Sequence, residues 1–108
     1  MINIEILELS NGKKPFDIWL YKIKDKNIKD IIYARLDRVE NGNFGDFKYL
    51  GDEIYELKFA IGIRIYFAKI KNSLVILLCV GDKSSQKRDI EKAKKYWQEN
   101  KEMYEKTH

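Results

Sequence analysis

The residues best able to do chemistry in this chain are cations that recur at short intervals in its second half. Lys58, Arg64 and Tyr66 fall in two alternating stretches, "YELKF" and "GIRIYF", and Lys83 follows a long apolar run. Guanidinium and ammonium groups bind phosphate and stabilise negative charge that develops in a transition state. This pattern indicates an anion site, with phosphate polymers as one class of ligand.

The stretch "GDKSSQKRDIEKAKKYW" joins the apolar run to a lysine-rich helix and holds a second group of candidates. Ser84 or Ser85 is the natural N-cap of that helix. Lys87 and Arg88 fall in its first turn, where cations oppose the helix dipole, whereas a bound anion would favour them. Two interpretations stay open here. The turn either only caps the helix, or also contacts phosphate through Lys83, Ser84, Ser85, Gln86, Lys87 and Arg88.

The apolar periodicity predicts the elements that must position these residues, beginning with a half-buried strand over residues 2–6. Pro15 suits the first turn of a helix. Asp25 or Asn27 can cap a second helix, which Asn41-Gly42 would end. The apolar stripes at helical spacing are Phe16, Trp19, Leu20 and Ile23 in the first helix, and Ile28, Ile32, Leu36 and Val39 in the second.

The period then changes to that of strands. Alternating residues predict strands near 47–50, 54–59 and 63–68, and Leu74 to Val80 is apolar on both faces, as in a central strand. Short connections make these strands antiparallel, and a last helix runs from about Gln86 to Met103. The predicted fold class is α+β. It has a mostly antiparallel sheet of four to five strands, two N-terminal helices packed on it and a C-terminal helix, with the helices covering one face.

Period-two geometry separates the core from the candidate site. If Leu57, Phe59, Ile63 and Ile65 point into the core, then Glu56, Lys58, Arg64 and Tyr66 project from the opposite face. Lys58 and Arg64 would be neighbours on adjacent strands, and like charges in that position are destabilising without a partner. The face is therefore either a solvated surface with a Glu–Lys pair or an anion site.

Bulk properties narrow the function classes. A chain of 108 residues with a formal net charge of +4 corresponds to one domain, residues 1–108, with a mild bias toward phosphate polymers or an acidic partner. The single cysteine, Cys79, lies in an apolar run, so we expect a buried thiol and a reducing cytoplasm. The N-terminus is unlike a signal peptide, and the longest apolar run is far short of the ~20 residues of a membrane span.

The sequence resembles the RelE/ParE superfamily of bacterial toxins over nearly its whole length. The carrying motifs are "YELKFAIGIRIYFA", the apolar strand, and "GDKSSQKRDIEKAKKYWQE", with "KPFDIWL" and "DKNIKDIIYARLDRVENGNFGDFKYLGDEIYEL" before them. The closest branch is that of the addiction module killer proteins, related to HigB. This resemblance implies a RelE-like fold and a type II toxin paired with a helix-turn-helix antitoxin, which would be its only link to operator DNA.

Ribonuclease members of the superfamily cleave messenger RNA, often on the ribosome, without a metal or other cofactor, through attack of the RNA 2′-hydroxyl on the adjacent phosphate. By resemblance, Arg64 would stabilise transition-state charge, Lys58 would act as a phosphate clamp or a base, and Lys83 would hold phosphate at the helix start. Tyr66 would orient a group or donate a proton. The only histidine, His108, is terminal, whereas several relatives use a histidine or tyrosine near the C-terminus; Tyr104 could substitute.

The leading hypothesis is an endoribonuclease toxin, because a cation cluster is expected of an RNA-cleaving site. The alternative is a ParE-like, non-catalytic inhibitor of DNA gyrase, and a third is a binding module without toxicity. The sequence-based expectation for variants is that Lys83→Ala and Arg64→Ala abolish toxicity and leave the melting temperature near that of the parent. Ser85→Ala would mainly lower stability, because a helix cap contributes ~1 kcal/mol.

Overall fold

The computed structural model describes residues 1–108, and its chain begins with a strand, two helices and a loop. Strand β1 spans Asn3–Ile6, helix α1 Pro15–Lys22 and helix α2 Lys26–Glu40. Pro15 opens α1 at a position where its missing N–H costs nothing. The Asp25 carboxylate caps α2 by accepting from the Asn27 N–H at 2.8 Å. Both helices therefore begin where the sequence predicts.

The remaining elements form a β-meander that ends in the longest helix. Strands β2 (Phe47–Gly51), β3 (Ile54–Lys58), β4 (Ile63–Ile70) and β5 (Leu74–Asp82) precede a short 3₁₀ turn, Lys83–Ser85, and helix α3, Gln86–Thr107. The last helix thus ends at Thr107, beyond the predicted Met103, because Tyr104 is still buried against the sheet. None of the helices combines the length and apolar character that crossing a membrane requires.

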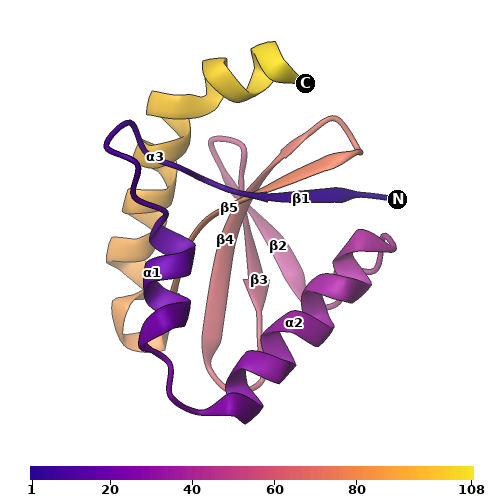
Figure 1. Ribbon diagram of the computed structural model, residues 1–108, viewed down its shortest axis with the longest axis vertical. Helices are drawn as coiled ribbons and strands as arrows, with labels where there is room; N and C mark the ends of the chain where they lie inside the picture. Colours follow the sequence, from indigo (N-terminus) through magenta and orange to yellow (C-terminus); the bar gives the residue numbers. More distant parts are fainter.

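The five strands form one sheet in the order β1-β5-β4-β3-β2 (Figure 1). Strands β2 to β5 pair antiparallel with their chain neighbours, and β1 pairs parallel with β5. The sheet is therefore mixed and mostly antiparallel, and the fold class is α+β as predicted. β5 lies between β1 and β4, which agrees with the central strand expected from its two apolar faces.

The helices cover both faces of the sheet, and the prediction that they cover one face is wrong. On one side, Phe16 and Leu20 of α1 and Ile32 and Val39 of α2 share a core with the sheet. On the other side, Ala93, Trp97 and Tyr104 of α3 pack on residues of β3, β4 and β5. We call these the α1/α2 face and the α3 face. The physical reason is that β5 is apolar on both sides, so each side needs a cover.

Candidate functional site

Three strands bring the predicted cations to one end of the sheet. Lys58 at the end of β3 lies directly opposite Arg64 on β4, and Arg64 lies opposite Gly81 on β5. Gly81 is followed by Asp82 and the turn that begins with Lys83. The predicted register and the predicted adjacency of Lys58 and Arg64 are both confirmed, since Leu57, Phe59, Ile63 and Ile65 pack in the core of the α1/α2 face.

The α3 face at this end of the sheet is not a solvated surface. Glu56, Arg64 and Tyr66 are 1%, 6% and 0% exposed, because α3 covers them, whereas Lys58 is exposed. The interpretation of a solvated face with a Glu–Lys pair is therefore wrong. The alternating pattern of the strands predicted correctly which face these residues share. It did not predict that a helix covers this face, because their polarity indicated exposure to solvent.

Glu56 is the partner of Arg64, as the sequence argument on like charges anticipated, although it was not among the predicted site residues. Its Oε1 lies 2.7 Å from Arg64 Nε and accepts a hydrogen bond from Gln86 Nε2 at 3.2 Å. Lys48 Nζ lies 3.9 Å from the other carboxylate oxygen. Glu56 sits two residues before Lys58 on the same strand face, diagonal to Arg64. That diagonal spacing was the available signal, since i, j±2 neighbours lie within reach of long side chains.

Arg64 is held by charge more than by directed hydrogen bonds. Its Nε–H does not point at Glu56 and is buried without a hydrogen-bond acceptor, so the 2.7 Å contact is an ion pair only. One further nitrogen, Nη1, donates to the Gly62 carbonyl at a long 3.3 Å. The guanidinium therefore keeps capacity for an additional acceptor such as a phosphate oxygen.

Tyr66 lies inside the molecule below α3. Its hydroxyl has no hydrogen-bond partner, and Glu56 is its direct neighbour on β3. Burial, followed by the charges of Glu56 and Asp89, raises the pKa of Tyr66 well above its usual range. The phenol therefore stays protonated, and its complete burial keeps it from contacting a polymer at the surface.

The helix start is capped by a residue that the sequence interpretation overlooked. The carboxylate of Asp82 accepts hydrogen bonds from the Ser84 N–H at 2.9 Å, the Ser84 hydroxyl at 2.6 Å and the Ser85 N–H at 3.2 Å. These bonds, with that of the Ser84 hydroxyl the largest cause, lower the pKa of Asp82. Ser85 is the N-cap of α3 by position but caps no N–H group of that helix; its hydroxyl instead accepts from the Asp82 N–H at 3.3 Å and completes a capping box around the 3₁₀ turn. The protein's own carboxylate thus occupies N–H groups that a phosphate would have used.

Ser85 instead ties α3 to β5. Its hydroxyl donates to Asp89 Oδ2 at 2.5 Å, and Asp89 is 8% exposed. Both side chains lie close to Gly81. A Cβ atom at this position would collide with the Asp89 carboxylate. The thiol of Cys79 lies 3.5 Å from the Asp89 carbonyl oxygen, and burial raises its pKa to about 12. Cys79 is therefore the buried thiol that the sequence predicted.

The remaining predicted cations are free at the surface. Lys83, Lys87 and Arg88 are exposed on the 3₁₀ turn and the first turn of α3, and none of them forms an ion pair. They follow the end of β5, at the same end of the sheet where Lys58 is exposed and Arg64 is buried. This arrangement can bind phosphate oxygens through side chains, with Arg64 as a partly covered inner cation.

Arg35, on α2, fixes the main chain around Lys58 and was also missed. It donates to the carbonyl oxygens of Phe44, Asp46 and Lys58 at 3.0, 2.9 and 2.9 Å. The Lys58 N–H in turn donates to the Asp46 carbonyl. Nothing in the helical pattern marked Arg35, because only the tertiary fold brings these carbonyls to it.

A neighbouring cavity of about 120 Å³ opens beside the cations. The cavity is lined by Asp46, Phe47, Lys48, Glu56 and Lys58, so it lies between the edge strand β2 and the candidate site. No group of three or more His, Cys, Asp or Glu side chains is arranged to hold a metal ion.

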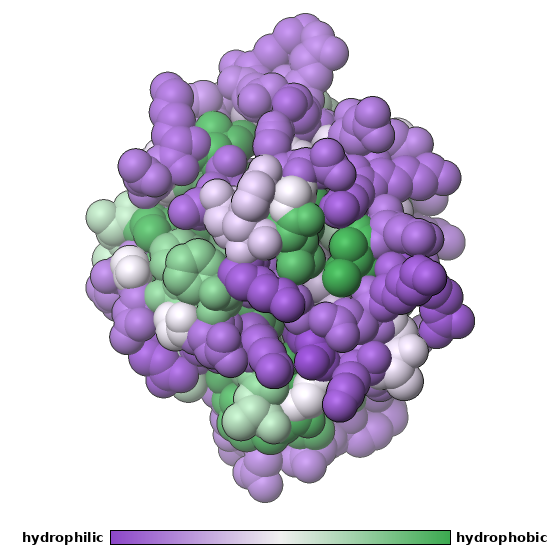
Figure 2. Space-filling model, turned by 180° about the vertical axis from the view of Figure 1, so that it is seen from behind, coloured by the Kyte–Doolittle hydropathy of each residue, from purple (hydrophilic) through white to green (hydrophobic).

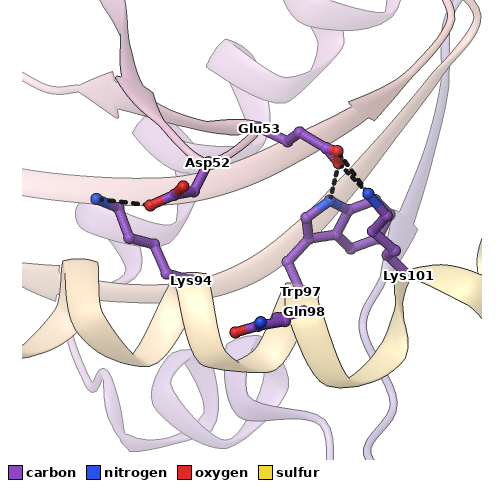
Figure 3. Close-up of a pocket in the computed structure, with 6 residues that line it drawn as sticks. All are labelled: Asp52, Glu53, Lys94, Trp97, Gln98 and Lys101. Carbon is purple, nitrogen blue, oxygen red and sulfur yellow. Dashed lines mark hydrogen bonds and ion pairs between the residues drawn. The ribbon is translucent and has the colours of Figure 1, made fainter.

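A separate cavity of about 410 Å³ lies between the β2–β3 turn and α3, and its charged groups are already paired (Figure 3). Both oxygens of Glu53 lie 2.9 Å from Lys101 Nζ, and Oε1 also accepts from Trp97 Nε1 at 3.2 Å. Asp52 pairs with Lys94 at 3.3 Å. These contacts form a clasp that holds the β2–β3 turn against α3. They leave no free cation in the cavity for a ligand.

The structure thus defines a small α+β protein with a cation-rich site at one end of its sheet. No protein-family model matches the chain. It is 48% identical over 86 residues to a protein of Haemophilus influenzae described as uncharacterized, with 78% of this chain and 87% of that relative covered. The chain therefore belongs to the same family as that protein.

Proposed function

We propose that this chain is the toxin of a type II toxin–antitoxin system with a RelE-like fold, and that it is a cytoplasmic endoribonuclease cleaving messenger RNA. In this proposal the RNA 2′-hydroxyl attacks the adjacent phosphate, breaks the bond to the 5′-oxygen of the next nucleotide and leaves a cyclic phosphate. The reaction needs cations near the phosphorane-like transition state, because that state carries more negative charge than the substrate.

The observation that carries the proposal is the direct pairing of Lys58 with Arg64 at the sheet end. A fold keeps two cations opposite each other only when a counter-charge offsets their repulsion. Glu56 supplies one negative charge to this cluster, and it lies against Arg64 rather than against Lys58. A phosphate oxygen bound between Lys58 and Arg64 would supply the second.

The proposed roles follow from exposure. Arg64 stabilises transition-state charge, and Glu56 is the positioning residue that holds it. Lys58, with its exposed amine, clamps the scissile phosphate, while Lys83, Lys87 and Arg88 hold neighbouring phosphates through their side chains. Because Asp82 occupies the N–H groups of Ser84 and Ser85, the helix start contributes cations rather than an N–H cradle.

The test is to induce the chain in cells and to map new 5′ ends on transcripts. Discrete cuts that disappear in Lys58→Ala and Lys83→Ala, but persist in Lys95→Ala, would support the proposal. Lys95 is a matched control because it is an exposed lysine farther along α3. Growth arrest with induced DNA damage and no cuts would overturn the ribonuclease assignment in favour of a gyrase inhibitor.

The same proposal includes an antitoxin that neutralises this chain. Its formal net charge of +4 favours an acidic or amphipathic partner segment. Co-expression with the product of the adjacent reading frame is expected to give a stable complex and to restore growth. A neighbouring product that neither co-purifies nor protects cells would contradict the toxin–antitoxin assignment.

A further inference from the structure

An exposed cluster of aromatic rings lies at the β2 edge of the sheet on the α1/α2 face. We call it the aromatic platform and define it as Phe44, Phe47, Tyr49 and Tyr55. Neighbouring rings lie close: Phe44 is 5.1 Å from Phe47, and Tyr49 is 5.0 Å from Tyr55. Phe47 and Tyr49 remain 41% and 58% exposed. Such a group of rings at the surface marks an interaction site.

The platform rests on a rigid base. The buried ring of Phe67 stacks on Phe44 at 5.7 Å and on Tyr55 at 5.3 Å. Arg35 further fixes the Phe44 carbonyl through a 3.0 Å hydrogen bond. The outer rings are therefore presented on a packed sheet and not on a mobile loop, which lowers the entropy lost when a ligand stacks on them.

Cations accompany these rings. Lys69 Nζ lies 4.8 Å from the centre of the Tyr55 ring and 5.4 Å from that of Phe44. Lys48, between Phe47 and Tyr49 in the sequence, projects to the opposite face of the same edge strand, and its side chain is 67% exposed. Aromatic faces with lysines around them suit a ligand that is flat, aromatic and anionic.

The platform is continuous with the cation cluster of the candidate site. Phe47 lines the same 120 Å³ cavity as Lys48, Glu56 and Lys58. A strand of nucleic acid that places a phosphate at Lys58 can therefore turn around the β2 edge. On most of the side shown in Figure 2 the surface is hydrophilic, with apolar side chains gathered in a few patches.

We propose that the aromatic platform stacks bases of a single-stranded RNA whose phosphates contact Lys48 and Lys58. Every base has a π-face, so stacking binds single strands with little sequence preference. A duplex keeps its bases stacked on one another and cannot use the platform. This inference rests on the proposed function and adds to it the substrate class, unpaired RNA, and the place where its bases lie.

The test measures binding of a short 2′-O-methyl RNA, which cannot be cleaved by 2′-hydroxyl attack, by fluorescence anisotropy at several salt concentrations. Phe47→Leu keeps an apolar side chain at the edge strand and removes only the aromatic face. We expect it to weaken binding about tenfold or more, and to leave the salt dependence unchanged. Lys58→Ala is expected to reduce the salt slope by about 0.7, the value for one phosphate contact on a single strand.

Two controls make the result specific to stacking. Tyr21→Leu changes an exposed ring on α1, outside the platform, and is expected to bind RNA like the parent. An abasic oligonucleotide of the same length is expected to bind the parent and Phe47→Leu equally. Thermal melting of Phe47→Leu checks that the variant is folded.

The outcomes separate this inference from the proposed function. Parent-like binding by Phe47→Leu, with a loss in Lys58→Ala, would overturn stacking and leave the ribonuclease proposal standing. Failure of the parent to bind any single strand would overturn both. If Phe47→Leu binds RNA normally but no longer captures the co-expressed adjacent product, the platform is a protein-docking surface and the inference is wrong.

Discussion

The two buried arginines of this protein lie on opposite sides of the sheet and are held in opposite ways. Arg35, on the α1/α2 side, donates to three main-chain carbonyls at 2.9–3.0 Å and lies 4.8 Å above the Phe59 ring. Arg64, on the α3 face, lies beside the Glu56 carboxylate with its Nε–H unbonded. Both are less than a tenth exposed.

The difference separates a structural cation from one that can bind a ligand. Arg35 directs all three of its nitrogens at main-chain carbonyls, two of them in the loop between α2 and β2. Arg64 is neutralised by one side chain and keeps donor capacity. The α1/α2 face is otherwise an apolar core, whereas the α3 face buries Glu56, Arg64 and Asp89. The less satisfied polar groups therefore gather where we place the function.

The largest effect is expected from breaking the ion pair of Arg64. Arg64→Ala leaves the Glu56 carboxylate buried without its partner, which typically lowers the free energy of unfolding by about 3–5 kcal/mol. The buried ion pair therefore replaces the sequence-based expectation, that this variant melts near the parent, with the expectation of a large loss of stability. Urea denaturation measures this loss of stability. A midpoint like that of the parent would show that the Glu56 carboxylate reaches solvent once Arg64 is removed.

The double variant Arg64→Met with Glu56→Gln separates stability from function. Replacing a buried ion pair by neutral groups of similar volume is often neutral for stability. The amide that replaces the Glu56 carboxylate keeps an oxygen that can accept from Gln86. We expect stability close to the parent with toxicity abolished. Full toxicity of this folded variant would exclude a role for the Arg64 charge.

A smaller loss, about 3 kcal/mol, is expected for Arg35→Lys. Hydrogen bonds from charged donors contribute about 1.5–3 kcal/mol each, and an ammonium group cannot match the guanidinium fork that reaches three carbonyls. Because Arg35 fixes the main chain of Lys58 but contacts no proposed ligand itself, transcript cleavage at a temperature where the variant is folded should fall far less than in the double variant of Arg64 and Glu56. Loss of cleavage by the folded variant would erase the distinction between the two arginines.

Gly81→Ala probes the close approach of α3 to β5 beneath the site. The new Cβ would meet the Asp89 carboxylate and the Ser85 hydroxyl, so the helix start must shift. Overpacking of this kind costs about 2 kcal/mol. Thermal melting measures it, and a parent-like melting temperature would mean that this contact yields without strain.

The smallest effect on stability is expected at the clasp of Figure 3, where the pKa of Glu53 fixes the direction of the pH dependence. The hydrogen bond from Lys101 is the main cause that lowers the pKa of Glu53 below 4.5, its value without these contacts. The clasp therefore stabilises the fold above pH 4.5, and this stabilisation is lost as pH falls through the lowered pKa. Its side chains are 41–45% exposed, so solvent screening keeps the effect below those expected at the buried residues.

The matching measurement compares melting temperatures at pH 7 and pH 3. Glu53→Gln should melt below the parent at pH 7, and this deficit should shrink at pH 3. Glu99→Gln, an exposed glutamate on α3 that forms no ion pair, should match the parent at both pH values. An equal deficit of Glu53→Gln at both pH values would mean that packing, rather than charge, holds the turn.

Local patterns in the sequence determined the elements and their register. Alternation over residues 54–67 placed Leu57 and Ile65 in one core and Arg64 and Tyr66 on the other face, because side chains on strands alternate with period two. The same alternation placed Lys58 next to Arg64, because the short bend between their strands leaves only one antiparallel register that keeps both apolar sets inside. The apolar run of β5 likewise indicated a central strand.

Only the tertiary structure decided what covers each face and which group neutralises which charge. That α3 crosses the face of Glu56 and Arg64, that Asp82 fills the helix start, and that Arg35 reaches the Lys58 carbonyl all depend on contacts that the tertiary fold creates. A polar side chain on a strand looks the same in sequence whether it meets water or a helix. Its environment is fixed by long-range packing, because both faces of β5 must be buried and the last helix is the element left to cover the second.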